Sequence, residues 1–334
     1  FNVIDLSNDH ILTENILPNS GGLGYGYFEL DSISLKNILN QVSSVTDPLL
    51  RCSMYISLWE NMLNKNVKPA KVLGSFINAL GSESDPQNVN LLLGYIQTIF
   101  WKFTNENKRF SVAKDLEQII WDKINSVSSS GLKSAYFKAF KSIALTENGV
   151  DKLLGLWLKK FVIPGLELSE QDLTEVSYEL AIRDVENSDS ILDIQEDRIT
   201  NVEKKEQFKF VRKAATSNEE IRKIFFESLK NEKNREKEPW VIDAHYYFHH
   251  ALRNKETLTY IRPSLDLLKE IQATGDIFFP KRWLDATFYG HNSIDAVLEI
   301  NLFFNENPEF PENLKNKILQ STDLVFRASI INVE

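Results

Sequence analysis

The sequence predicts an all-α protein: a HEAT-like α-solenoid, or superhelix, of about fifteen helices that follows a short β-hairpin. From about residue 34 onward, apolar residues recur every three to four positions. Signals for helix starts recur along the same stretch, and the breaks between amphipathic segments are short, as between antiparallel neighbouring helices. No clean sequence repeat is present, so a closed, irregular helical bundle is the alternative architecture.

The first thirty residues follow a different pattern. Four of the 13 glycines lie between Gly21 and Gly26, next to Tyr25, Tyr27 and Phe28. Glycines supply the positive φ angles of a tight turn, and an aromatic run is typical of a strand. We therefore expect a β-hairpin here, which is too small to fold alone.

Several helix starts are marked by capping residues. Asp47-Pro48 and Asp85-Pro86 each place a carboxylate acceptor before a proline at the first helical position. Capping boxes are indicated at 217–220 and, more weakly, at 169–172. With the apolar periodicity, these marks predict helices over 47–64, 69–82, 86–104, 109–126, 132–145, 149–162, 169–184, 188–198, 201–215, 218–230, 239–252, 256–274, 280–290, 293–306 and 311–330.

Composition argues against some functions. The chain carries 38 Lys and Arg against 47 Asp and Glu, a net charge of −9, which does not favour binding to nucleic acid or to an anionic membrane. No apolar run approaches the roughly 18 residues of a membrane span. A single cysteine, Cys52, cannot form an internal disulfide, so the compartment stays open between cytoplasm and periplasm. Phe1 is followed by no signal-like stretch, and we expect the chain to begin inside a longer gene product.

The sequence contains no complete catalytic constellation. His245 and His249 have the i, i+4 spacing of a zinc-peptidase helix, but Tyr246 occupies the place of the glutamate that would activate a metal-bound water. Cys52 lies in an apolar stripe, where cysteine usually serves as a small buried side chain. We therefore predict no catalytic residue and no metal site. A self-sufficient metalloenzyme that uses His245, His249 and His250 remains the least favoured alternative.

One late segment, residues 274–285, combines a helix end with a cationic helix start. Lys281, Arg282 and Trp283 lie in the first turn after Pro280. Cations at a helix N-terminus oppose the helix dipole, so two of them suggest a contact with an anion or a carboxylate. The structural alternative is a salt bridge to a neighbouring helix, with Trp283 in the core.

Five segments together resemble the M1 zinc aminopeptidases, in particular the bacterial branch of that family. The first three match the end of the family's small β-sandwich domain and the beginning of its C-terminal helical domain, also called the ERAP1-like C-terminal domain. The last two match later parts of the helical domain. The segments are residues 19–31, 47–51, 58–62, 238–253 and 274–285.

The resemblance implies that residues 1–33 end a β-sandwich domain and that residues 34–334 form a superhelical domain without catalytic residues. The family motifs H-E-x-x-H and G-x-M-E-N are absent from this chain, and by resemblance they belong, with the zinc ion, to a preceding catalytic domain. No cofactor is then expected here. The expected partners are the catalytic domain of the same polypeptide, over which the helical domain would close, and peptide substrates.

The resemblance also implies that the helical domain walls a peptide cavity. Arg282 would clamp a carboxylate through its planar fork, and aromatic side chains would contact peptide side chains. The candidate substrate-binding residues are Lys281, Arg282, Trp283, His245, Tyr246 and Tyr289. The alternative function is a free-standing helical-repeat scaffold that binds another protein.

Overall fold

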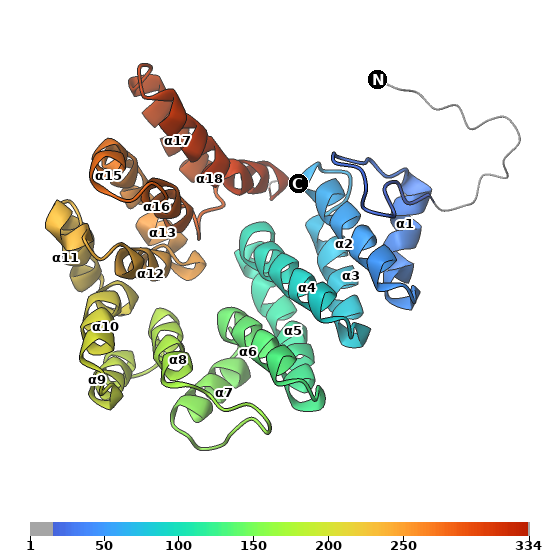
Figure 1. Cartoon of the computed structure of the whole chain (residues 1–334), viewed down its shortest axis with the longest axis horizontal. Helices are drawn as coiled ribbons and strands as arrows, with labels where there is room; N and C mark the ends of the chain where they lie inside the picture. Colours follow the sequence, from blue (N-terminus) through green and yellow to red (C-terminus); the bar gives the residue numbers. More distant parts are fainter. Residues whose placement is uncertain (1–15, 333–334) are drawn as a thin grey trace, which may run out of the picture. The chain divides into compact units, whose positions relative to one another are not determined.

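The computed structural model describes residues 16–332, and this part of the chain is helical (Figure 1). The prediction of an all-α, helical-repeat fold is confirmed. The α-helices are α1 (Ser32–Gln41), α2 (Pro48–Leu63), α3 (Pro69–Ser82), α4 (Pro86–Thr98), α5 (Glu106–Ser126), α6 (Ser130–Ile143), α7 (Glu147–Trp157), α8 (Glu170–Ile182), α9 (Ser188–Arg198), α10 (Val202–Ala215), α11 (Glu219–Ser228), α12 (Glu238–Phe248), α13 (Asn254–Thr257), α14 (Ile261–Asp266), α15 (Leu268–Thr274), α16 (Phe279–Thr287), α17 (Ile294–Glu306) and α18 (Glu312–Ile331). Short 3₁₀ or π segments are η1 (Val42–Ser44), η2 (Ile99–Phe103), η3 (Glu232–Arg235), η4 (Ala251–Arg253) and η5 (Leu258–Tyr260).

The predicted helix starts are largely correct. Asp47 caps α2, and the Asp85 carboxylate accepts hydrogen bonds from two backbone amides at the start of α4. Ser169 forms the predicted capping box at α8. At α11 the prediction is wrong by one residue, because the side chain of Asn218, rather than that of Ser217, accepts from the first free amides of the helix.

Two helical regions differ from the prediction. Helix α1 was not expected, although the Asp31 carboxylate accepts hydrogen bonds from the amides of Ile33 and Ser34 and so marks its start. The single helix predicted over 256–274 is divided into α13, η5, α14 and α15. Pro263 lies inside this region, and proline has no amide hydrogen to donate to the preceding turn.

The predicted β-hairpin is not found within residues 16–31, where the structure has a turn but no strand; residues 1–15 lie outside the described part of the chain. The Asn19 side chain closes a glycine loop instead, accepting from the Gly24 amide and donating to the Gly24 carbonyl. The backbone amides and carbonyls of an extended segment need hydrogen-bond partners. In a sheet an adjacent strand supplies them, and here a side chain does. Asn61 of α2, fully buried, accepts from the Leu30 amide and donates to the Phe28 carbonyl.

The chain divides into two compact units, residues up to Ile96 and residues from Gln97 onward. The division falls inside α4. In the first unit, α1, α2 and α3 all contact one another. Their core is aromatic, and the rings of Tyr55 and Phe76 meet edge to face at a centroid distance of 5.8 Å.

The second unit is a succession of paired helices (Figure 1). Helix α5 pairs with α6, α8 with α9 and α10, α10 with α12, α12 with α16, and α16 with α18. Helix α18 also contacts η2, so the last helix of this unit returns to its first element. None of the described helices is both long and apolar enough to cross a membrane.

Buried or half-buried cations in the second unit bind the carbonyl groups at helix ends. The last four carbonyls of a helix have no intrahelical partner, and the C-terminal end of the helix dipole attracts positive charge. Arg183, for example, donates to the carbonyls of Lys141 and Ser142 at the end of α6, 3.1 and 2.9 Å away. The same role is filled by Lys102, Arg109, Lys133, Arg198, Arg222, Arg235 and Arg253.

Candidate functional site

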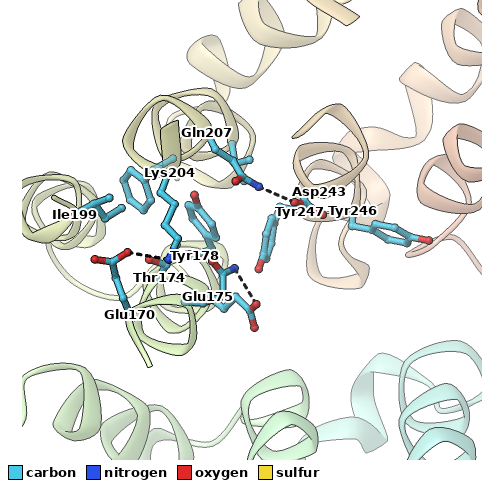
Figure 2. A pocket seen from close by; sticks show the side chains of 13 residues that line it. Glu170, Thr174, Glu175, Tyr178, Ile199, Lys204, Gln207, Asp243, Tyr246 and Tyr247 are labelled. Carbon is cyan, nitrogen blue, oxygen red and sulfur yellow. Dashed lines mark hydrogen bonds and ion pairs between the residues drawn. The ribbon is translucent and has the colours of Figure 1, made fainter. Parts of the chain in front are cut away.

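A pocket of about 320 Å³ opens between α8, α10 and α12 in the second unit. Figure 2 shows side chains from these three helices directed into the same space. On each helix the lining residues follow helical spacing, since side chains three or four positions apart share one face. They are 170, 171, 174, 175 and 178 on α8, then 204, 207, 208 and 211 on α10, and 243, 246 and 247 on α12, and Ile199 after α9 completes the lining.

The inner wall of the pocket is aromatic. The ring of Tyr178 stacks on Phe208 at a centroid distance of 5.0 Å and meets Tyr247 at 4.9 Å. Phe208 belongs to the hydrophobic core of the unit, so the stacked Tyr178 ring is held against that core. These contacts hold the tyrosine rings in place without any ligand.

The rim of the pocket is mainly acidic. Glu170, Glu175 and Asp243 contribute carboxylates, and Lys204 contributes the one lysine of the lining. Lys204 lies 3.4 Å from Glu170, and Glu175 forms an ion pair with Lys141. Asp243 forms no ion pair within residues 16–332 and accepts one hydrogen bond, from Gln207 at 3.1 Å (Figure 2). Partial removal from water and the nearby charge of Glu175 raise the pKa of Asp243.

Tyr178 is only 4% exposed, and it lines the pocket. Figure 2 shows its ring in the space between the three helices. Burial and the neighbouring charge of Asp243 raise the pKa of Tyr178 above its usual range, so the hydroxyl stays protonated near neutral pH. It can therefore donate a hydrogen bond or accept one from a bound group.

The predicted substrate-binding residues fall into two groups. Tyr246 lines the pocket, and its ring meets Tyr289, which is 40% exposed, edge to face at 5.0 Å. Lys281 forms an ion pair with Asp285 on its own helix at 2.5 Å, and Arg282 is exposed next to the Phe278 ring. These four side chains reach the surface.

Trp283 and His245 are completely buried, so the structure places them in the core and not on a cavity wall. Their rings stack at a centroid distance of 4.1 Å, and the Trp283 indole donates to the Ser264 carbonyl. The physical reason is that Trp283 lies on the inner face of α16, about 100° around the helix from the exposed Arg282. This corresponds to the structural alternative stated for Trp283 above.

His245 belongs to a buried histidine cluster with His249 and His291. His245 Nε2 lies 2.9 Å from the Thr287 hydroxyl, and His249 Nδ1 lies 3.1 Å from His291 Nε2. Burial lowers the pKa of His245 and of His291 to about 3, and that of His249 well below its ordinary value, so the rings are neutral. Residues 16–332 contain no group of three or more His, Cys, Asp or Glu side chains arranged to hold a metal ion.

Sequence reasoning found Tyr246 but missed the rest of the pocket. Tyr178, Glu175 and Asp243 come from two helices whose polar and aromatic residues resemble ordinary surface positions. The signal available was the helical spacing on each face. Nothing in the sequence indicates that three such faces meet. Searches with protein-family models and among curated proteins find no match to this chain.

Proposed function

We propose that this chain is the non-catalytic C-terminal helical domain of an M1-like zinc aminopeptidase, an enzyme that removes N-terminal amino acids from peptides. In this role the domain covers a catalytic domain of the same polypeptide and forms part of the wall of the peptide cavity. The observation that carries the proposal is that the segments on which the resemblance depends contact each other in pairs. We call each of these contacts a joint.

The first joint lies in the unit that ends at Ile96. Asn61 belongs to the segment 58–62, and its buried amide binds the backbone of the segment 19–31 at Phe28 and Leu30. The Tyr27 hydroxyl adds a hydrogen bond to the same Asn61 side chain at 3.3 Å. Two motifs more than thirty residues apart are therefore parts of one contact, as expected for a segment that enters a helical domain.

The second joint lies in the other unit. Glu238, at the start of the segment 238–253, accepts a hydrogen bond from the Asp276 amide at 2.7 Å. His245 and Trp283 stack within the same pair of segments. These contacts hold α12 against α16, which agrees with a domain that shapes a cavity.

The test compares two polypeptides: this chain, and the longer polypeptide that contains it. Hydrolysis of aminoacyl fluorogenic substrates is measured for both, with added zinc and with a chelator. We expect this chain alone to be inactive under both conditions. We expect the longer polypeptide to contain H-E-x-x-H and G-x-M-E-N upstream and to show activity that the chelator removes.

Two results would overturn the proposal. One is a longer polypeptide without either motif upstream of this chain. The other is zinc-dependent turnover by this chain alone that is lost in His249→Gln, since it would make the buried histidines an active site.

A free-standing protein-binding scaffold is the second candidate function, and one observation favours it. Ile294, Leu298 and Leu302 lie at i, i+4 and i+8 on α17 and are 58, 52 and 48% exposed. A contiguous apolar face of this kind is typical of an interaction surface. Absence of an upstream catalytic domain, together with a partner whose binding is lost in Leu298→Glu, would favour the scaffold over the aminopeptidase domain.

A further inference from the structure

The pocket between α8, α10 and α12 combines three features that together define a ligand class. It has room for an extended side chain, because about 320 Å³ corresponds to roughly ten water molecules. It has aromatic faces, from Tyr178, Tyr246 and Tyr247. It also has three carboxylates against one ammonium group, that of Lys204.

The charge distribution favours a cation at the rim of the pocket. Lys204 is occupied by Glu170 and Lys141 by Glu175, which leaves the Asp243 carboxylate without a cationic partner in the described part of the chain. A carboxylate has about four acceptor positions, and Asp243 uses one of them for Gln207. Figure 2 shows Asp243 next to Tyr247 on α12, with its dashed contact to Gln207 on α10.

The aromatic wall adds a preference for the shape of the cation. Aromatic faces attract ammonium and guanidinium groups, and a guanidinium can stack on a ring while donating two parallel hydrogen bonds to a carboxylate. Tyr178 lines the pocket, and its hydroxyl supplies a further acceptor there. A lysine ammonium would satisfy the charge but not the planar geometry.

We propose that this pocket binds the guanidinium side chain of an arginine residue in a peptide, with Asp243 as the carboxylate partner, Tyr247 as the stacking face and Tyr178 as a hydrogen-bond acceptor. As a statement about substrates, the inference rests on the proposed function, because it names arginine-containing peptides as the favoured class. The binding itself requires only this chain, so the two can be tested separately.

The experiment uses N-acetyl-arginine methylamide as the probe and N-acetyl-citrulline methylamide as its neutral counterpart. The two differ by the charge on a group of nearly the same shape. Binding to the full chain is followed by ligand-observed NMR and by calorimetry. We expect the arginine probe to bind with a dissociation constant of about 1 mM, as for a small ligand held by a few charged contacts, and the citrulline probe to bind at least tenfold more weakly.

Variants of Asp243 and Tyr178 test which side chains contact the arginine probe. Asp243→Asn should weaken binding of the arginine probe by about tenfold, and Tyr178→Phe, which keeps the ring, by roughly threefold. Asp197→Asn, on the exposed face of α9, makes the same change of charge outside the pocket and should leave binding unchanged. Thermal unfolding by circular dichroism verifies that each variant is folded.

Equal affinity for the arginine and citrulline probes, or no binding of the arginine probe at 20-fold the expected dissociation constant, would overturn the inference. Wild-type affinity in Asp243→Asn would overturn it as well. If the arginine probe binds as expected but the longer polypeptide lacks the aminopeptidase motifs, arginine binding by the pocket is supported. The role of the pocket in selecting aminopeptidase substrates is then refuted.

Discussion

Arg183 offers a direct test of how helix ends are stabilised in this protein. It lies at the end of α8, where its side chain is 3% exposed, and its guanidinium donates to the carbonyls of Lys141, Ser142 and Ala144 at the end of α6. It also pairs with Glu179 one turn earlier. We consider replacement by methionine, which keeps much of the apolar stem and removes all of the donors.

The expected loss follows from the groups left without a partner. An unsatisfied buried polar group costs about 1–3 kcal/mol, and removing one member of a buried ion pair costs about 3–5 kcal/mol in total. Water reaches part of this site, since the Glu179 side chain is 12% exposed. We therefore expect Arg183→Met to lower the free energy of unfolding by about 4 kcal/mol. For a unit of this size, that corresponds to a fall in Tm of about 10 °C.

Thermal and urea unfolding are followed by tryptophan fluorescence, because five of the six tryptophans lie after Gln97 and report on the second unit. Two variants separate the contributions. Glu179→Gln removes the negative charge, but its amide oxygen can still accept from Arg183 and the carbonyl contacts keep the guanidinium hydrogen-bonded, so it should cost only about 1–2 kcal/mol. Arg262→Met removes exposed ion pairs to Asp266 and Glu306 and should cost less than about 1 kcal/mol.

A Tm of Arg183→Met within about 2 °C of that of Arg262→Met would refute the reasoning, since it would mean that water replaces the guanidinium at the end of α6. A loss in Glu179→Gln as large as that in Arg183→Met would assign the effect to the ion pair and not to the capped carbonyls.

Two further predictions concern the core around α12 and α16. The folded-state pKa of the buried histidines is lower than their ordinary value of 6.5, so the stability they confer is present above pH 6.5 and is lost as the pH falls. Each should contribute a loss of roughly 2 kcal/mol between pH 7 and pH 5, and a urea midpoint that stays constant over this range would contradict the assignment. At Gly290, an added Cβ atom would lie 2.2 Å from the His249 carbonyl oxygen, so Gly290→Ala should lower the free energy of unfolding by at least about 1–3 kcal/mol. In Gly131→Ala on α6 the added atom meets only the Ser129 hydroxyl at 3.8 Å, and equal urea midpoints for the two variants would show that the turn after His249 can move aside.

Local signals predicted most of the helices. Asp47 and Ser169 work as caps because a side-chain oxygen and the free amides it accepts from lie within three residues of each other. The sequence pattern does not predict helix α1, because its cap, Asp31, follows a glycine-rich segment whose composition is typical of a turn and a strand. The break near Pro263 was missed because the apolar periodicity continues across it.

The glycine-rich segment shows where local interpretation fails. Its composition fits a turn and a strand, yet between residues 16 and 31 its backbone partner is the Asn61 side chain of α2. That choice depends on a contact across thirty residues, which no local pattern reveals. The same limit applies to Trp283, which shares a helical turn with the exposed Arg282 and points into the core.

The sequence by itself determined the fold class, the order of the helices and most of their starts, because helix formation depends on capping and periodicity within a few residues. Only the tertiary structure decided which helix faces meet. In the folded chain Asp243 and Tyr178 line the same pocket, and cationic side chains such as Arg183 bind the carbonyls at the ends of neighbouring helices. Such contacts join residues that are distant in sequence, and the charge or ring of a single residue does not encode its partner.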